Sequence, residues 1–124
     1  MKRASRSAQH DLNTPPAVDI AAVTAYCEQR VRPHALHQVR MQAIVERHAV
    51  TLVERRARWR PEYGPEWTTS PVARLRWSVR RRDWTLYWRD RNHRFHRYPY
   101  TQPTADITTL LDEIDRDSTG IFWG

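Results

Sequence analysis

The sequence predicts an α+β domain: an amino-terminal helix, about five antiparallel strands in meander order, and a carboxy-terminal helix packed on the sheet. Three observations support this prediction. Apolar residues recur at three- and four-residue spacings near both ends of the chain, as on one face of a helix. Between these ends, apolar and polar residues alternate as they do in strands. Turn-like segments at residues 47–49, 80–83 and 90–93 separate the alternating stretches, which indicates hairpins.

The chain is expected to start with a flexible basic arm, residues 1–14, followed by a single domain, residues 15–124. The arm is polar and has no apolar period, whereas the remainder is long enough to bury a core. Pro15 and Pro16 follow Thr14, which suits a helix start because proline is tolerated in the first helical turn. The apolar stripe of this helix comprises Ile20, Val23, Cys27 and Val31.

Residues 36–46 fit two patterns. With helical spacing, the apolar residues are Leu36, Val39, Ala43 and Ile44. With the alternation of a strand, they are Val39, Met41, Ala43 and Val45. We interpret this segment as a strand, because residues 50–59 have the composition of a strand and need a neighbour. A turn at residues 47–49 then connects the two strands as a hairpin.

Residues 60–70 are expected to form a loop, because two prolines and a glycine interrupt any regular element there. Tyr63 and Trp67 within it are interpreted as a lid over the edge of the core, in preference to an exposed binding surface.

The strand predicted at residues 72–80 has a clean alternation. Its inward side comprises Ala73, Leu75, Trp77 and Val79. Its outward side comprises Arg74, Arg76, Ser78 and Arg80. A turn at Arg81 and Arg82 leads into the next strand.

Residues 84–100, WTLYWRDRNHRFHRYPY, are predicted to form a hairpin rich in aromatic rings. Asp90 and Asn92 suit its turn, because their side chains bond nearby main chain and both residues tolerate left-handed backbone. A three-residue loop places Trp84, Leu86 and Trp88 on the same face as Tyr100, Tyr98 and His96. A two-residue loop sets Trp88 opposite Phe95 and so exchanges the faces. We favour the three-residue loop, because it makes one continuous aromatic face.

A second helix is expected near the carboxy terminus, with Thr104 as its N-cap and Asp106 in its first turn. Gly120 follows it, where a helix or turn ends with positive φ. Residues 121–123 are too apolar for a free tail and are expected to dock into the core. The apolar stripe of the helix comprises Ile107, Leu110, Leu111 and Ile114.

Four segments carry a resemblance to a known family: VTLVERRARW, PVARLRW, WTLYWRDRNHRFHRY and the ending LLDEIDRDSTGIFWG. From residue 33 onward the sequence resembles a family of small, mainly actinobacterial proteins catalogued as domain of unknown function 3024. The resemblance implies a short single-domain protein, and it implies no catalytic residue, cofactor or partner. Members often have a glycine near residues 47–49, which supports the hairpin. This sequence lacks that glycine, so we expect a wider turn.

Composition bounds the function. The chain has one cysteine, Cys27, which excludes an internal disulfide and suits a reducing cytoplasm, where we expect the protein to be located. At a helical core position it is expected to be an inert small hydrophobe. No stretch approaches the roughly 18 apolar residues of a membrane span, so we expect no membrane partner.

The charge is concentrated in the middle of the chain. Residues 30–97 contain seventeen arginines and six acidic residues, a net charge of +11, whereas the whole chain has +7. A GC-rich genome explains the preference for arginine over lysine, but it explains the excess of basic over acidic residues poorly. The basic middle therefore indicates an anionic partner.

Metal binding is not expected. His93 and His96 are flanked by arginines whose charge opposes a divalent ion, and zinc requires three or four ligands. Asp115, Asp117 and Gly120 resemble the opening of a calcium loop, but the chain ends before the glutamate that such a loop needs. We expect no cofactor and assign no catalytic residue.

The favoured hypothesis is a small non-enzymatic protein that binds RNA or a ribonucleoprotein through an arginine-rich sheet face. The candidate residues are Arg56, Arg58, Arg74 and Arg76 on two adjacent strands, with Arg91, Arg94 and Arg97 in the hairpin. A protein-interaction module of a cytoplasmic complex is the first alternative. The second is a small RNA-cleaving enzyme, in which His93 or His96 and Tyr98 transfer protons and Arg91 or Arg94 binds the phosphate.

Overall fold

The computed structural model describes residues 14–57 and 67–123, and it confirms the predicted α+β class. Its helices are α2 (Ala17–Arg30), the short 3₁₀ helix η1 (Pro33–Ala35) and α3 (Ile107–Arg116). Its strands are β1 (Val39–Val45), β2 (Ala49–Arg56), β3 (Thr68–Ser78), β4 (Asp83–Arg89) and β5 (Phe95–Arg97).

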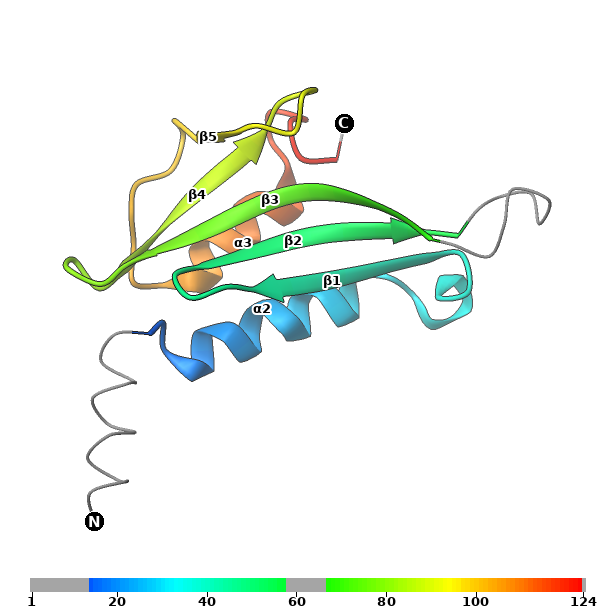
Figure 1. The fold of residues 1–124 in the computed structure, drawn as a ribbon, viewed down its shortest axis with the longest axis horizontal. Coiled ribbons are helices and arrows are strands. Elements are labelled where there is room, and N and C mark those ends of the chain that lie inside the picture. Colours follow the sequence, from blue (N-terminus) through cyan, green and yellow to red (C-terminus); the bar gives the residue numbers. More distant parts are fainter. Residues whose placement is uncertain (1–13, 58–66, 124) are drawn as a thin grey trace, which may run out of the picture.

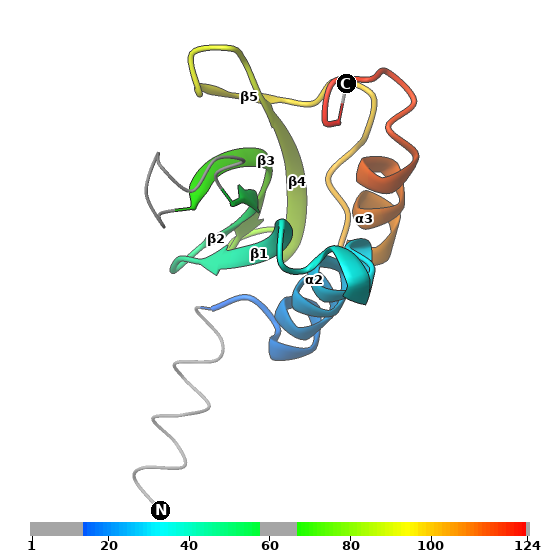
Figure 2. The same cartoon turned by 90° about the vertical axis from the view of Figure 1, so that its right-hand side faces the viewer.

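The strands form one antiparallel sheet in the order β1-β2-β3-β4-β5, so each strand pairs with the next along the chain. This is the predicted meander. The sheet is strongly twisted, and the hairpin of β4 and β5 curls away from the other strands (Figure 1). Helices α2 and α3 lie on the same side of the sheet (Figure 2). The core fills the space between the sheet and these helices.

The predicted stripe of α2 is buried at its centre, where Val23 is fully buried and Cys27 is 2% exposed. Burial raises the pKa of the Cys27 thiol to about 12, which fits an inert residue. The helix begins after Pro16, and Asp19 in its first turn accepts a hydrogen bond of 2.9 Å from Nε1 of Trp84. This bond ties the amino-terminal helix to the middle of the sheet.

The interpretation of residues 39–45 as a strand is confirmed, since β1 pairs with β2 along its whole length. The expected wider turn is wrong: the amide of Glu46 donates to the carbonyl oxygen of Ala49 at 2.8 Å, which leaves only Arg47 and His48 in the connection. Neither residue has positive φ. The missing glycine therefore does not lengthen this hairpin.

Strand β3 starts at Thr68, four residues earlier than predicted, so residues 68–70 do not belong to the loop. The register between β2 and β3 shifts between Leu52 and Val53, which leaves room for Pro71 in the strand at an irregularity. The prediction for Tyr63 lies outside the described residues. Trp67 is described, and the guanidinium carbon of Arg40 lies 4.8 Å from its ring centre.

The three-residue loop of the aromatic hairpin is confirmed, because Trp88 pairs with His96 and the amide of Tyr98 donates to the carbonyl oxygen of Leu86. Within the loop, His93 has φ of 63°. One carboxylate oxygen of Asp90 accepts the amides of Asn92 and Arg94 at 2.8 and 3.0 Å. The carboxylate thus stabilises the loop in the way expected of a turn aspartate.

The N-cap of α3 is Asp106 rather than Thr104. The carboxylate of Asp106 accepts the amide of Thr108 at 3.1 Å, whereas Thr104 forms a β-bridge with Trp84. Thr104 still contributes, because its hydroxyl accepts the amide of Asp106 at 3.0 Å. The predicted stripe of four apolar residues on α3 is buried.

The carboxy-terminal tail docks as predicted. Phe122 is 8% exposed, and its ring centre lies 5.1 Å from that of Tyr98. Asp117 ends α3 in the left-handed region, and its carboxylate accepts the amides of Phe122 and Trp123, both at 2.9 Å. The indole Nε1 of Trp123 donates to the carbonyl oxygen of Ile114 at 2.8 Å. Gly120 has the expected positive φ, 73°.

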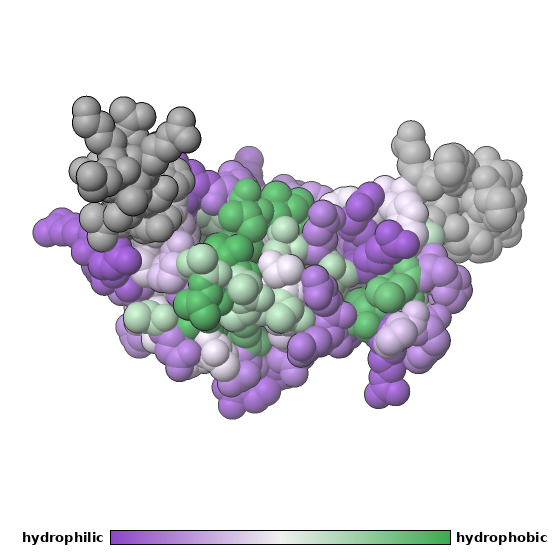
Figure 3. All heavy atoms as spheres, turned by 90° about the horizontal axis from the view of Figure 1, so that it is seen from below, coloured by the Kyte–Doolittle hydropathy of each residue, from purple (hydrophilic) through white to green (hydrophobic). Residues whose placement is uncertain are grey.

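Apolar side chains also reach the surface. On the face seen from below, they form two areas separated by polar residues (Figure 3). Among the described residues, the exposed large apolar side chains are those of Val18, Leu36, Ile44, Val45 and Tyr100. Within the described residues, no helix is long and apolar enough to cross a membrane.

Candidate nucleic-acid interface

The side of the sheet that faces away from α2 and α3 is termed the open face (Figure 2). It is assigned from strand alternation: Ala73, Leu75 and Trp77 of β3 point into the core, so Arg74 and Arg76 point the other way. Cross-strand pairing extends the assignment to the other strands. The residues of the open face that matter below are Arg40, Thr51, Arg55, Arg74, Arg76, Tyr87, Arg89, Phe95 and Arg97.

Arg74 is fixed at the centre of the open face. Its Nε donates to the hydroxyl of Thr51 at 2.9 Å, and its guanidinium carbon lies 4.0 Å from the ring centre of Phe95. A carboxylate oxygen of Glu46 lies 4.0 Å from its Nη2, and the side chain is only 25% exposed. Arg74 therefore links β2, β3 and β5 and has little freedom to reorient.

Arg76 makes a second arginine–ring stack beside the first. Its guanidinium carbon lies 4.6 Å from the ring centre of Tyr87, and the residue is exposed. Arg97 is opposite Tyr87 in the β4–β5 register, so it lies on the same face, where it too is exposed. Rings and guanidiniums thus alternate across three neighbouring strands.

A third stack lies on β1, at the opposite edge of the sheet. Arg40 stacks on Trp67 and donates from Nε to the carbonyl oxygen of Leu36 at 3.1 Å. Arg55 is directly opposite Arg40 in the β1–β2 register and so lies on the open face.

A hollow of about 330 Å³ lies where the open face meets the turn between β1 and β2. Arg47, His48, Arg74 and Arg76 line it, and Glu46 is the single carboxylate among its lining residues. An anionic group in this hollow would meet several cations and one negative charge.

The sequence correctly placed Arg74 and Arg76 side by side, but the grouping of Arg56 with them is wrong. Arg56 is opposite Val39 in the β1–β2 register and lies on the helix side of the sheet, where its Nε bonds a carboxylate oxygen of Glu54 at 2.7 Å. Arg58 lies outside the described residues. The buried residues Val50 and Leu52 carried the missing signal, because Arg56 continues their alternation and Arg55 does not.

The hairpin arginines divide into two groups. Arg97 is on the open face, whereas Arg91 and Arg94 are exposed in and beside the loop. Arg89, which the sequence did not single out, is committed to structure: its Nε donates to the carbonyl oxygen of Pro71 at 2.6 Å, and its Nη2 to the hydroxyl of Ser70 at 3.1 Å. It braces the irregular part of β3.

The proton-transfer groups of the enzyme hypothesis are engaged in separate contacts within the fold. The hydroxyl of Tyr98 donates to Glu113 at 2.8 Å, and Tyr98 is 1% exposed. His96 lies on the helix side, where its ring stacks 4.8 Å from that of Trp88 and its Nε2 is 2.7 Å from a carboxylate oxygen of Asp90. No group of three or more potential metal ligands occurs within the described part of the chain.

The bond to His96, together with the two loop amides, lowers the pKa of the Asp90 carboxyl to about 2. A carboxyl whose pKa is lower in the folded state than in the unfolded state stabilises the folded state. This contribution is fully present at a pH above the unfolded-state pKa, and it is lost as the pH falls through the folded-state pKa. We therefore expect the hairpin loop to keep this contribution at pH 5 and to lose it as pH falls from about 4 towards 2. His96→Ala should raise the pKa of Asp90 without abolishing the loop. A ¹³C-detected carboxyl titration measures the pKa, and an unchanged value in the variant would contradict the assigned cause.

A family model described as "Domain of unknown function (DUF3024)" matches residues 12–124. Neither the curated proteins nor the solved structures yielded a match.

Proposed function

We propose that this chain, which belongs to the DUF3024 family, binds single-stranded or structured RNA through the open face of its sheet. The observation that carries the proposal is the alternation of guanidiniums with aromatic rings, Arg74 on Phe95 and Arg76 on Tyr87. Guanidiniums match phosphate oxygens with their fork of donors, and rings stack on unpaired bases. The two groups together suit a flexible, charged strand better than they suit a purely apolar partner.

We expect the protein to bind RNA with little preference for base sequence, because contacts with phosphates position a strand without reading its bases. We also propose that the protein is located in the cytoplasm, which agrees with the free, buried thiol of Cys27. A ribonucleoprotein would present the same phosphate chemistry and is covered by the same hypothesis.

The test is a salt-titrated fluorescence anisotropy assay on the whole chain with a labelled single-stranded RNA of about twelve nucleotides. We expect log K to fall linearly with log salt, by roughly 0.7 for each phosphate that the protein neutralises. A duplex RNA of the same length should bind more weakly, because its bases are not free to stack. Absence of binding at the lowest salt concentration would refute the proposal.

A protein-interaction module is the second candidate, and exposed apolar residues on the edge strand favour it. Ile44 and Val45 are adjacent in β1 and are 42% and 52% exposed. Edge strands also offer unpaired backbone groups to a partner strand. If this candidate is correct, Val45→Ser, which changes the helix side of β1 and not the open face, should release a co-purifying protein and leave RNA binding unaffected, which an affinity pull-down compared with the parent would show.

A further inference from the structure

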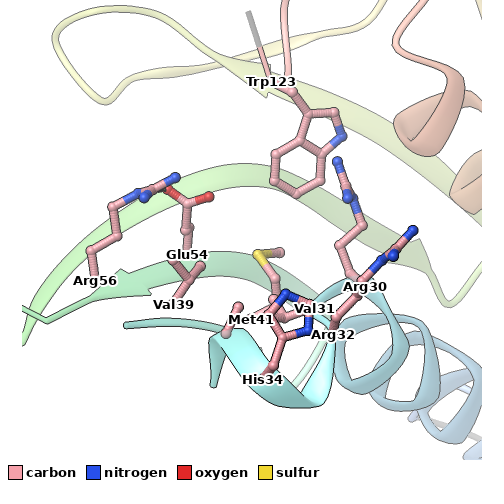
Figure 4. A pocket seen from close by; sticks show the side chains of 10 residues that line it. Arg30, Val31, Arg32, His34, Val39, Met41, Glu54, Arg56 and Trp123 are labelled. Carbon is pink, nitrogen blue, oxygen red and sulfur yellow. Dashed lines mark hydrogen bonds and ion pairs between the residues drawn. The ribbon is translucent and has the colours of Figure 1, made fainter. Parts of the chain in front are cut away.

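A second cationic hollow lies on the helix side of the sheet, away from the open face (Figure 4). This hollow is an open pocket of about 400 Å³, lined by the end of α2, the segment with η1, the strands β1 and β2, and the carboxy-terminal tail. This volume is within the range of roughly 300–1,000 Å³ that is usual for small-molecule sites.

The pocket has an excess of positive charge. Three arginines line it, Arg30, Arg32 and Arg56, together with His34. Glu54 is the only carboxylate among the lining residues, which gives them a net charge of +2, and Asp115, outside the lining, lies 3.8 Å from Nε of Arg30 and offsets part of this charge. These groups come from three different elements, which places cations on opposite sides of the same hollow (Figure 4).

The rest of the lining is apolar. Val39 and Met41 of β1 form part of it, and Met41 is 9% exposed. Trp123 provides another wall, and the guanidinium carbon of Arg30 lies 4.4 Å from its ring centre. A ligand in this pocket therefore meets flat apolar surface next to guanidiniums.

Trp123 is fixed by hydrogen bonds from both its backbone and its side chain. Asp117 accepts its amide and Ile114 accepts its indole Nε1, so both the backbone and the ring are fixed. The ring is nevertheless only partly buried. The fixed ring of Trp123, with the Arg30 guanidinium stacked on it, preorganises that guanidinium at the pocket, because little side-chain entropy remains to be lost when a ligand binds.

We propose that this pocket binds a small planar anion of the nucleoside monophosphate class. The phosphate pairs with the guanidiniums of Arg30 and Arg32, and the base lies on the apolar surface of Val39 and Met41. The carboxylate of Glu54, which is 24% exposed and bonded to Arg56, accepts a hydrogen bond from an exocyclic amino group. The site is separate from the proposed RNA-binding face and does not depend on it.

The experiment is isothermal titration calorimetry of the whole chain with the four nucleoside monophosphates, their nucleosides, and inorganic phosphate. We expect monophosphates with an amino group on the base to bind more tightly than uridine monophosphate. Nucleosides and inorganic phosphate should each bind at least about tenfold more weakly, because each lacks one half of the recognised structure.

Two variants locate the site. Arg32→Gln should weaken monophosphate binding about tenfold, whereas Arg116→Gln, which removes an equal charge at the end of α3 outside this pocket, should leave it unchanged. Glu54→Gln should reduce the preference for amino-bearing bases, because the amide supplies a donor as well as an acceptor. Both Arg32 and Arg116 are exposed, and a melting curve checks that each variant is folded.

Several results would overturn the proposal. These are no binding of any monophosphate at 1 mM, equal affinity for inorganic phosphate, or equal effects of Arg32→Gln and Arg116→Gln. An amide ¹H–¹⁵N titration adds a positional readout: shifts are expected near Arg32, Glu54 and Trp123. Shifts confined to Arg76 and Tyr87 would move the ligand to the open face and reject this site. If the parent chain binds monophosphates but does not bind RNA, the proposed function is rejected and this pocket is not.

Discussion

Deletion of residues 121–124 is expected to lower the melting temperature by about 10–20 °C. The deletion removes the ring of Phe122, which is 8% exposed and contacts Tyr98. Losing a buried phenylalanine side chain typically costs about 3–5 kcal/mol. It also removes the two hydrogen bonds that the carboxylate of Asp117 accepts from the amides of Phe122 and Trp123. Circular dichroism melting of the parent and the truncated chain measures the effect.

A matched control separates packing from chain length. Phe122→Leu keeps the tail and its hydrogen bonds and still buries an apolar side chain, so it should cost much less than the deletion. If the truncated chain melts at the temperature of the parent, the tail does not contribute to stability. The tail would then be a peptide that binds a partner, and the protein-interaction candidate would gain.

Reversal of two charges on the open face should abolish RNA binding. Arg76→Glu combined with Arg97→Glu is expected to lower affinity about 100-fold or more, since each lost charge-assisted hydrogen bond is worth about 1.5–3 kcal/mol. The melting temperature should change little, because both residues are exposed and the Arg76–Tyr87 stack contributes only about 0.5–1 kcal/mol at an exposed site. Anisotropy at low salt measures the affinity.

Arg74 is a poor choice for this test despite its central position. Its bond to Thr51 and its stack on Phe95 hold three strands together, and a glutamate there would face Glu46. A loss of binding in that variant would not separate recognition from folding. Arg76 and Arg97 avoid this difficulty.

The matched control is Arg116→Glu combined with Ala21→Glu and Thr24→Glu, which makes the same change in net charge at exposed helix positions, away from the open face and from the helix-side pocket. It should retain most of the affinity. An equal loss in both variants would show that net charge, not the open face, controls binding. Unchanged binding in the open-face variant would move the site to Arg91 and Arg94 of the hairpin loop.

The sequence was sufficient to predict the structure where a local pattern and the tertiary structure agree. The alternation of Ala73, Leu75 and Trp77 predicted which side of β3 is buried, because the two-residue repeat of a strand depends on neither neighbouring elements nor long-range contacts. The repeat alone left two registers open for the aromatic hairpin, and the preference for one continuous aromatic face selected the correct one.

The sequence was insufficient where a distant contact decides the structure. Thr104 has the chemistry of an N-cap, but its pairing with Trp84 places the start of α3 two residues later. The start of β3 was missed because its Thr, Ser and Pro residues are common in loops, and pairing with β2 makes them a strand. Arg55 and Arg56 are adjacent in β2 and point to opposite faces of the sheet. The β1–β2 register was needed to show that Arg55, not Arg56, lies on the open face.

The open face also depends on contacts that no single segment reveals. The stacks of Arg74 on Phe95 and of Arg40 on Trp67 each join residues more than twenty positions apart. The excess of arginine is evident from the amino-acid sequence, but the use of part of this charge inside the fold is not. Arg89, bonded to Pro71 and Ser70, is the clearest example.

The meander order has a consequence for how the protein is made. Each strand pairs with its neighbour in sequence, so the sheet can assemble as the chain emerges from the ribosome, from the amino terminus onward. The apolar side of that sheet, which includes Trp84 and Leu86, is covered in part by α3 and by Phe122, which are synthesised after the sheet. A nascent chain therefore carries an exposed apolar surface until residues 107–122 have emerged, and that interval is when aggregation or a chaperone competes with folding.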